Sequence, residues 1–272
     1  MTDPAAVPER SGLHLVEAGS GPDLLCLHGI GSCAESFRPQ LDGLAGTAHV
    51  IAWDAPGYGR SADPESEVDI TGFADAAADV IRSRASGSAH LLGVSWGGVI
   101  AQALALRHPE LVRSLVLADS SRGSGRTPAG AVKMRARAAE LAELGSEEFA
   151  RRRAPRLLSE QAPPELVERA IAIMTRALRL PGYRYAVEAM ADADTSSRLA
   201  EIRVPTLVLC GDRDRVTGIP ESRALADGIP GAVFETISGA GHLANQERPE
   251  SFNARVSSHI DAVESLRDDQ AV

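Results

Sequence analysis

The chain has 272 residues, of which 44% are hydrophobic and 24% are charged, and this balance excludes a disordered or fibrous protein. The formal net charge of −9 argues against nucleic acid or an anionic membrane as a general partner. No apolar run approaches the roughly 18 residues that span a bilayer, and the first ten residues lack the apolar stretch of a signal peptide. We therefore expect no membrane partner and a cytoplasmic location.

Short apolar runs alternate with segments of helical spacing along the chain. The runs that predict strands are, in chain order, residues 14–17, 24–27, 49–53, 89–92, 115–117, 206–209 and 233–237. Helical spacing of apolar residues predicts helices over 70–84, 99–107 and 249–266. This alternation predicts an α/β fold with a mostly parallel sheet and helices on both of its faces. The continuous apolar strands indicate burial on both sides of the sheet.

Residues 122–198 interrupt this rhythm, because they hold no convincing strand and several proline-broken helical segments. They carry 14 Arg and Lys residues against 10 Asp and Glu residues, a net charge of +4, whereas the rest of the chain has −13. We interpret this stretch as a helical insertion into an α/β core made of residues 11–121 and 199–266. Residues 1–10 and 267–272 are expected to be loose tails.

The three cysteines, Cys26, Cys33 and Cys210, predict no disulfide framework. Cys26 and Cys210 end apolar runs, so buried, reduced thiols are the expectation, which again fits a reducing cytoplasm. Because the chain has no CxxC pair, a thiolate zinc site has no support, and we expect no metal.

A serine lies in a glycine-rich turn between a predicted strand and a predicted helix. In the segment GVSWGG, Gly93 and Gly97 flank Ser95 in the pattern G-x-S-x-G. Between a strand and a helix, this pattern is typical of a nucleophilic serine. Glycine is needed where a Cβ would meet neighbouring backbone, and Ser95 is expected to be strained with its Oγ above the sheet. The backbone N–H of Trp96, at the start of the helix, can stabilise an oxyanion. The alternative is an ordinary strand-to-helix turn.

A second glycine-containing loop, LHGIGS, follows the strand predicted at residues 24–27. Its backbone can approach the same oxyanion closely, and the N–H of Ile30 is the natural second donor. His28, in this loop, could be a general base, but a structural role is favoured because it lies at the strand end and a better histidine exists.

That better histidine is His242, which follows the last predicted strand in the small-residue turn SGAGH. A serine nucleophile needs a base, and the base needs an orienting acid. Asp214, after the strand TLVLC, is the preferred acid, with Asp212 as the lesser choice there. Asp119, at the end of a neighbouring strand, stays open as an alternative. Asp54 also ends a strand and is expected to hold the following turn by hydrogen bonds to the backbone.

The chain order Ser95, Asp214, His242 at successive strand ends is typical of one fold. On these residues the chain resembles the α/β-hydrolase fold serine hydrolases from about residue 13 to residue 260. The motifs that carry the resemblance are HGIGS, DAPGYGRS, GVSWGG, VPTLVLCGDRDRVT and GAGHLANQERPESF. The resemblance implies a catalytic triad, an acyl-enzyme, no cofactor, and a lid formed by residues 122–198.

Within that superfamily the chain most resembles the 3-oxoadipate enol-lactonases of aromatic catabolism, on the segments HGIGSCAESFRPQL, ADADTSSRLAEIRVPTLVLCGDRD and GHLANQERPESFN. It departs from them at Trp96, where a bulky side chain beside the nucleophile can reshape the pocket or can simply pack in the core. Ser95 argues against haloalkane dehalogenases and epoxide hydrolases, which use Asp there. Leu243, after the histidine, differs from the Trp usual in meta-cleavage C–C hydrolases.

The resemblance thus implies a small-molecule ester or lactone substrate, which for an enol-lactonase carries a carboxylate. The positive insertion is a candidate source of a cation for that group, but no particular arginine is singled out, because 27 of the 28 basic residues are arginine. Three alternatives stay open: a general carboxylesterase, a C–C hydrolase with the same triad, and a non-catalytic binding module that has kept the fold. The oligomeric state is not predicted.

Overall fold

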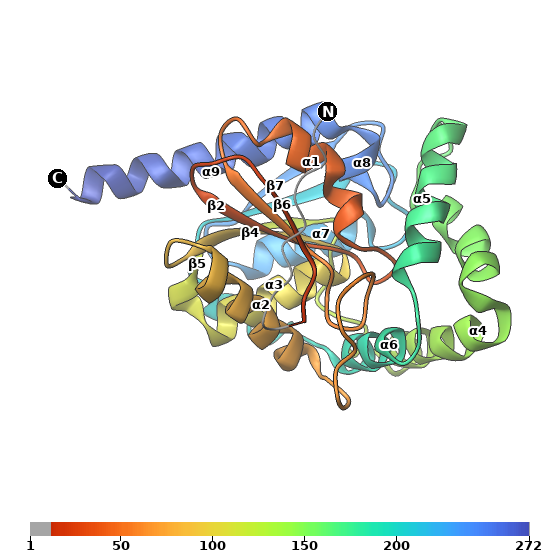
Figure 1. The fold of residues 1–272 in the computed structure, drawn as a ribbon. Helices are drawn as coiled ribbons and strands as arrows, with labels where there is room; N and C mark the ends of the chain where they lie inside the picture. Colours follow the sequence, from red (N-terminus) through yellow and green to blue (C-terminus); the bar gives the residue numbers. More distant parts are fainter. Residues whose placement is uncertain (1–11, 272) are drawn as a thin grey trace.

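A computed structural model of the protein describes residues 12–271, and the side chains as far as residue 267. The predicted amino-terminal tail, residues 1–10, lies outside the described residues. The closing helix α9 (Pro249–Ala271) continues past residue 266, where the sequence predicts its end, and it projects beyond the sheet in Figure 1. The helix can continue because no proline or glycine follows Leu266 to stop it.

The strands form one seven-stranded sheet in the order β1-β3-β2-β4-β5-β6-β7. Their bounds are β1 (Leu15–Ala18), β2 (Asp23–Leu27), β3 (His49–Trp53), β4 (Ala89–Val94), β5 (Val112–Ala118), β6 (Thr206–Gly211) and β7 (Val233–Ile237). Strand β1 pairs with β3 in antiparallel fashion, and every other pair in the sheet is parallel. The predicted fold class is confirmed.

Helices cover both faces of the sheet (Figure 1). The α-helices besides α9 are α1 (Arg38–Gly43), α2 (Ile70–Arg84), α3 (Trp96–Arg107), α4 (Pro128–Arg153), α5 (Pro164–Ala177), α6 (Gly182–Asp192), α7 (Gly218–Gly228) and α8 (Ala244–Glu247). The 3-10 helices are η1 (Ala34–Phe37), η2 (Pro109–Leu111), η3 (Ala154–Leu157) and η4 (Leu199–Glu201). No helix in the described residues has the length and hydrophobicity needed to cross a membrane.

Helix α2 forms where the sequence predicts it, and its bounds have a local cause. Phe73, Ala77 and Ile81 recur at intervals of four residues and are fully buried on one face. Asp69 caps the amino end by accepting a hydrogen bond from the N–H of Gly72 at 2.8 Å.

Two hydrophobic clusters pack on opposite faces of the sheet, and β2 contributes side chains to both. Leu25 and Leu27 belong to the cluster under α2 and α3, whereas Leu24 and Cys26 belong to the one under α1 and α9. This explains the continuous apolar runs and confirms the predicted burial of the central strands. Strand β7 differs: it is an edge strand, and Val233 is 54% exposed.

Residues 122–198 lie between β5 and β6 in the chain and supply α4, η3, α5 and α6. Helix α4 packs against both α5 and α6, and these three helices lie together to one side of the sheet in Figure 1. Gly145, with a φ of 73°, departs from helical geometry and kinks α4 in its second half. This part of the chain adds no strand to the sheet, so it sits as a helical layer beside the carboxyl ends of the strands that carry the candidate site.

Candidate active site

Ser95 stands between β4 and α3 in a conformation that non-glycine residues seldom adopt. Its φ is 55° and its ψ is −116°. Neighbouring groups hold it there: its N–H donates to the Ala118 carbonyl at 2.9 Å, and the Ser120 hydroxyl donates to the Ser95 carbonyl at 2.7 Å. The strain predicted from the sequence is confirmed, and its effect is to project Oγ out of the turn.

The two predicted glycine requirements at this turn are confirmed by close backbone approaches. A Cβ on Gly93 would lie 2.5 Å from the Gly97 carbonyl oxygen, and a Cβ on Gly97 would lie 2.0 Å from the Leu27 carbonyl oxygen. Gly97 therefore lets α3 begin directly against the end of β2. This contact brings the serine turn next to the loop that holds Ile30.

Three side chains predicted as catalytic meet at the carboxyl ends of β4, β6 and β7. His242 Nε2 lies 2.9 Å from Ser95 Oγ, and His242 Nδ1 lies 3.0 Å from Asp214 Oδ2. The His242 side chain is 4% exposed, and that of Asp214 is fully buried. With the Nδ1 proton directed at Asp214, Nε2 is free to accept the proton of the Ser95 hydroxyl, which is the arrangement that general-base catalysis requires.

Asp214 is held by the start of α7 as well as by His242. Its carboxylate accepts hydrogen bonds from the N–H of Val216 at 2.7 Å, the N–H of Gly218 at 3.1 Å and the hydroxyl of Thr217 at 2.6 Å. Sequence reasoning missed Thr217 as a site residue. The signal was present, because Thr217 ends the segment GDRDRVT and lies three residues after the acid.

The alternative acid, Asp119, has other partners. It is fully buried and accepts hydrogen bonds from the N–H of Gly211 at 2.7 Å and the N–H of Ala244 at 3.4 Å. Burial, helped by the charge of Asp214, raises the pKa of the Asp119 carboxyl to about 8 despite the opposing effect of His242. The carboxylate that reaches the imidazole is that of Asp214. The other carboxyl in this turn, Asp212, instead accepts from the N–H of Gly239 at 2.8 Å.

The charges of the Asp214–His242 pair stabilise one another. Burial alone would raise the pKa of Asp214, but the hydrogen bonds from His242, Thr217 and Val216 outweigh it and hold that pKa well below its usual range. Burial would lower the pKa of His242, but the hydrogen bond and charge of Asp214 outweigh it, so the pKa of His242 is raised. The imidazolium that forms during proton transfer is thus favoured by its surroundings.

This raised pKa predicts a pH dependence. Because its pKa is raised, His242 stays protonated to higher pH than an ordinary histidine, whose pKa is 6.5. The neutral imidazole that accepts the proton of Ser95 therefore becomes the main form only above pH 6.5. We expect kcat/KM for a neutral ester, followed from about pH 5 to 9, to rise with a midpoint above 6.5. In Asp214→Asn the midpoint should move to lower pH, because the charge that raises the pKa is gone. A wild-type midpoint below 6.5 would contradict this prediction.

The loop after β2 places the second predicted oxyanion donor beside the nucleophile. A Cβ on Gly29 would lie 3.4 Å from Ser95 Cβ, so the backbone of this loop passes directly over the serine. Within residues 12–271, neither the Ile30 N–H nor the Trp96 N–H donates to another group of the protein. Both are therefore available to an oxyanion formed at Ser95.

His28 has the structural role that the sequence favoured. Its Nε2 lies 3.0 Å from the Ala55 N–H and accepts from it, so its Nδ1 carries the proton and donates to the Gly29 carbonyl at 2.8 Å. Complete burial lowers the pKa of His28 and keeps it neutral. The turn role expected for Asp54 is also confirmed, since its carboxylate accepts from the N–H of Ala34 and of Arg60, each at 2.8 Å.

Of the two possibilities for the Trp96 side chain, the structure has the core-packed one, and the ring does not line the cavity. Its ring is fully buried in the core, edge-on to Phe73 with 4.9 Å between ring centroids and 5.5 Å from the ring of Tyr58. The reason is the direction of α3: its first residue points down into the cluster under the sheet, so only the backbone of Trp96 faces the nucleophile.

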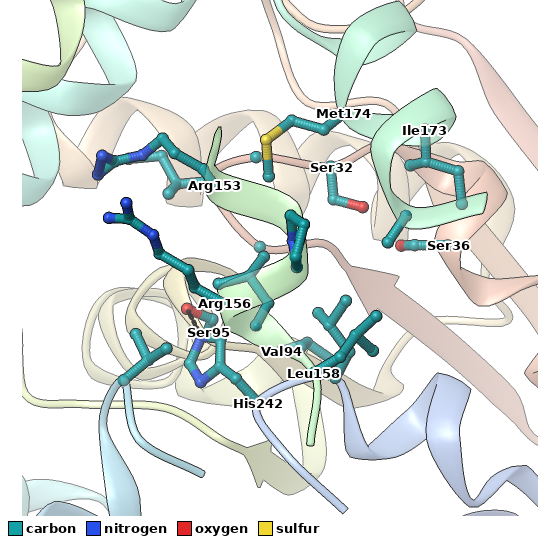
Figure 2. A pocket seen from close by; sticks show the side chains of 18 of the residues that line it. Ser32, Ser36, Val94, Ser95, Arg153, Arg156, Leu158, Ile173, Met174 and His242 are labelled. Atoms are coloured by element: carbon teal, nitrogen blue, oxygen red, sulfur yellow. Dashed lines mark hydrogen bonds between the residues drawn. The ribbon is translucent and has the colours of Figure 1, made fainter. Parts of the chain in front are cut away.

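A cavity of about 680 Å³ opens above Ser95 and His242. Figure 2 shows Leu158, Ile173 and Met174, all from the inserted segment, around it. A volume of this size suits a small organic molecule. The N–H of His242 donates to the Leu157 carbonyl at 2.7 Å, which ties the histidine loop to the inserted segment.

Comparison with known proteins agrees with this geometry. Residues 24–255 match the alpha/beta hydrolase family. The chain is 27% identical to 3-oxoadipate enol-lactonase 2 of Acinetobacter baylyi over 86% of this chain and 87% of that protein. A crystal structure of a hydrolase from Pseudomonas aeruginosa superposes with a TM-score of 0.84 at 29% identity, covering 95% of this chain and 98% of that one.

The chain is also 30% identical to polyketide synthase ThaQ of Burkholderia thailandensis over 96% of its own length, but it spans only 13% of that much longer protein. The family match and its hydrolase relatives make the protein a hydrolytic enzyme that acts on ester-type bonds. By this match, by its sheet order and by the serine turn between β4 and α3, the protein belongs to the alpha/beta hydrolase family.

Proposed function

We propose that the protein is a serine hydrolase that cleaves a lactone or carboxylic ester through an acyl-enzyme, with Ser95, His242 and Asp214 as its catalytic residues. The observation that carries the proposal is the unbroken chain of hydrogen bonds from Ser95 Oγ through His242 to Asp214 at the base of the cavity. A binding module would have no need of a strained serine held against a buried, charge-stabilised histidine.

In the first half-reaction, Ser95 Oγ attacks the carbonyl carbon and its proton passes to His242 Nε2. The N–H groups of Ile30 and Trp96 stabilise the oxyanion of the tetrahedral intermediate. The bond to the leaving oxygen then breaks, and His242 returns the proton to the departing group. Asp214 holds the imidazole in the required tautomer and stabilises its positive form throughout.

In the second half-reaction, water replaces the serine hydroxyl as the nucleophile. His242 removes a proton from a water molecule, the resulting hydroxyl attacks the acyl carbon, and the same two N–H groups stabilise the oxyanion. The bond to Ser95 Oγ breaks, and His242 returns the proton to the serine. The acid product leaves and the enzyme is restored without a cofactor in any step.

The substrate that we propose is an enol lactone of the 3-oxoadipate type, in a pathway of aromatic catabolism. The likeness to an enol-lactonase over most of both chains and the motifs in the loops around the site support it. Opening an enol lactone releases an enolate, which is a good leaving group and then ketonises. We also propose that residues 122–198 act as the lid over the cavity, since Met134, Phe149 and Ile173 of this segment line it.

A substrate panel tests this proposal. We expect kcat/KM to be highest on 3-oxoadipate enol-lactone and lower on its neutral methyl ester and on a short p-nitrophenyl ester, with Ser95→Ala as the control that defines the background rate. Equal or higher rates on the two neutral esters would contradict the enol-lactonase proposal and favour a general carboxylesterase. Faster turnover of a dienone product would favour a C–C hydrolase.

A further inference from the structure

The cavity above Ser95 is lined by more cations than anions. Its basic lining residues are Lys133, Arg137, Arg153, Arg156 and Arg215. Glu160 is the acidic side chain among the lining residues in the described part of the chain. Four of the five cations come from α4 and η3 of the inserted segment. Figure 2 shows the Arg153 and Arg156 side chains extending toward the same side of the cavity, above Ser95 and His242.

Two of these cations are already neutralised by the protein. Arg215 pairs with Glu160, with 2.7 Å between Nη2 and Oε1, and Arg153 pairs with Glu140, with 3.0 Å between Nη1 and Oε2. Among residues 12–267, no carboxylate lies within ion-pair distance of the other three: Lys133, Arg137 and Arg156. The cavity wall therefore keeps positive charge that the protein does not balance.

Arg137 is the most enclosed of these three. Its Nε atom is buried and has no hydrogen-bond partner, whereas Lys133 and Arg156 are exposed residues. The polar group beside the Arg137 guanidinium is the hydroxyl of Tyr183, which is itself buried and also lines the cavity. Arg137 is half-buried, and Glu140, the carboxylate whose charge acts on it, is already paired with Arg153. A buried guanidinium nitrogen without a partner is unfavourable, so we expect Arg137 to have an anionic partner in the working state.

The position of Arg137 also links it to the reaction centre. Its charge opposes protonation of His242, and burial lowers the pKa of Arg137 itself. Arg137 lines the same cavity as Ser95 and His242, so one substrate molecule can contact Arg137 with an anionic group and Ser95 with its scissile carbonyl. A planar guanidinium with several donors matches a carboxylate in geometry, which a single lysine does not.

We propose that Arg137 binds a free carboxylate of the substrate, with Arg156 as a second, more exposed cation at the same wall, and so selects anionic esters or lactones over neutral ones. This inference rests on the proposed function, because it names the substrate class of the same site. Arg137 is a specificity residue in this proposal and takes no part in the proton transfers between Ser95, His242 and Asp214.

The test compares two substrates that differ in one charge: mono-p-nitrophenyl succinate and its methyl ester. The variant is Arg137→Met, which keeps the length of the side chain and removes its charge. The matched control is Arg152→Met on the same helix, where Arg152 is 52% exposed, pairs with Glu148 at 2.6 Å and does not line the cavity.

We expect the wild type to have the higher kcat/KM on the acid. The ratio of kcat/KM for the acid to kcat/KM for the methyl ester should fall by about 10- to 100-fold in Arg137→Met, because one charged hydrogen-bonding pair is lost. Arg137→Lys should recover part of the ratio, and Arg152→Met should leave it unchanged. An unchanged ratio in Arg137→Met, in a protein that still hydrolyses both esters, would overturn the assignment of Arg137 and leave the proposed function intact.

A binding measurement keeps this inference separate from the proposed function. Calorimetry measures the affinity for monomethyl succinate of Ser95→Ala and of the double variant with Arg137→Met. The double variant should bind at least about tenfold more weakly. Equal affinities would overturn the inference whatever the hydrolysis result. Failure of the wild type to hydrolyse either ester or to react with a fluorophosphonate would instead refute the proposed function.

Discussion

We expect Ser95→Ala to lower kcat on a p-nitrophenyl ester by about a million-fold, close to the loss seen when a whole triad is removed. The reason is that the alanine leaves His242 with no hydroxyl to deprotonate, although the N–H groups of Ile30 and Trp96, which we propose stabilise the oxyanion, remain. The measurement is the steady-state rate, together with labelling by a fluorophosphonate, which should disappear.

A matched control for this prediction is Ser258→Ala, an exposed serine on α9, which should keep the wild-type rate and the wild-type labelling. A Ser95→Ala protein that retained activity within about a hundredfold of the wild type would show that another group is the nucleophile, since the N–H donors of the oxyanion site alone supply far less.

Asp214→Asn should lower kcat by roughly ten-thousand-fold. The amide can donate to Nδ1 of His242 in place of accepting from it, so the imidazole is held in the wrong tautomer and Nε2 carries the proton. The protein should stay folded, because the amide oxygen, at the position of Oδ1, can still accept from the N–H of Val216. The Thr217 hydroxyl can accept from the amide NH2 in place of donating to Oδ2. Steady-state kinetics and a thermal unfolding scan measure the two effects separately.

Asp119→Asn is the control that separates the two acids. With a pKa raised to about 8, the Asp119 carboxyl is already mostly protonated near neutral pH, so an amide at this position resembles its native state. The introduced amide can keep the 2.7 Å bond from the Gly211 N–H and lose the weaker 3.4 Å bond from Ala244, a change of about tenfold or less in kcat. A larger loss in Asp119→Asn than in Asp214→Asn would show that the acid has been assigned wrongly.

Features with a local cause were predictable from the sequence. The bounds of α2 follow from one apolar face and an Asp69 cap, and β3 and β7 span the predicted residues. The serine turn was predictable from its G-x-S-x-G pattern. The contact that requires Gly93 is local, with Gly97, whereas the contact that requires Gly97 comes from Leu27 at the end of β2. The short helices α1 and α7 were not predicted, because one to three turns of weak periodicity carry little signal and are stabilised by packing against the sheet.

The sequence by itself determined the α/β alternation. It also predicted the inserted segment and the candidate catalytic residues Ser95, Asp214 and His242, because each prediction depends on short patterns along the chain. Only the tertiary structure decided which partners those residues have. It brought the Thr217 hydroxyl to Asp214 and turned the Trp96 ring into the core. It also left the Arg137 Nε buried without a partner and without a carboxylate within ion-pair distance in the described chain. Burial and charge pairing depend on residues far apart in the chain, so no local pattern of sequence encodes them.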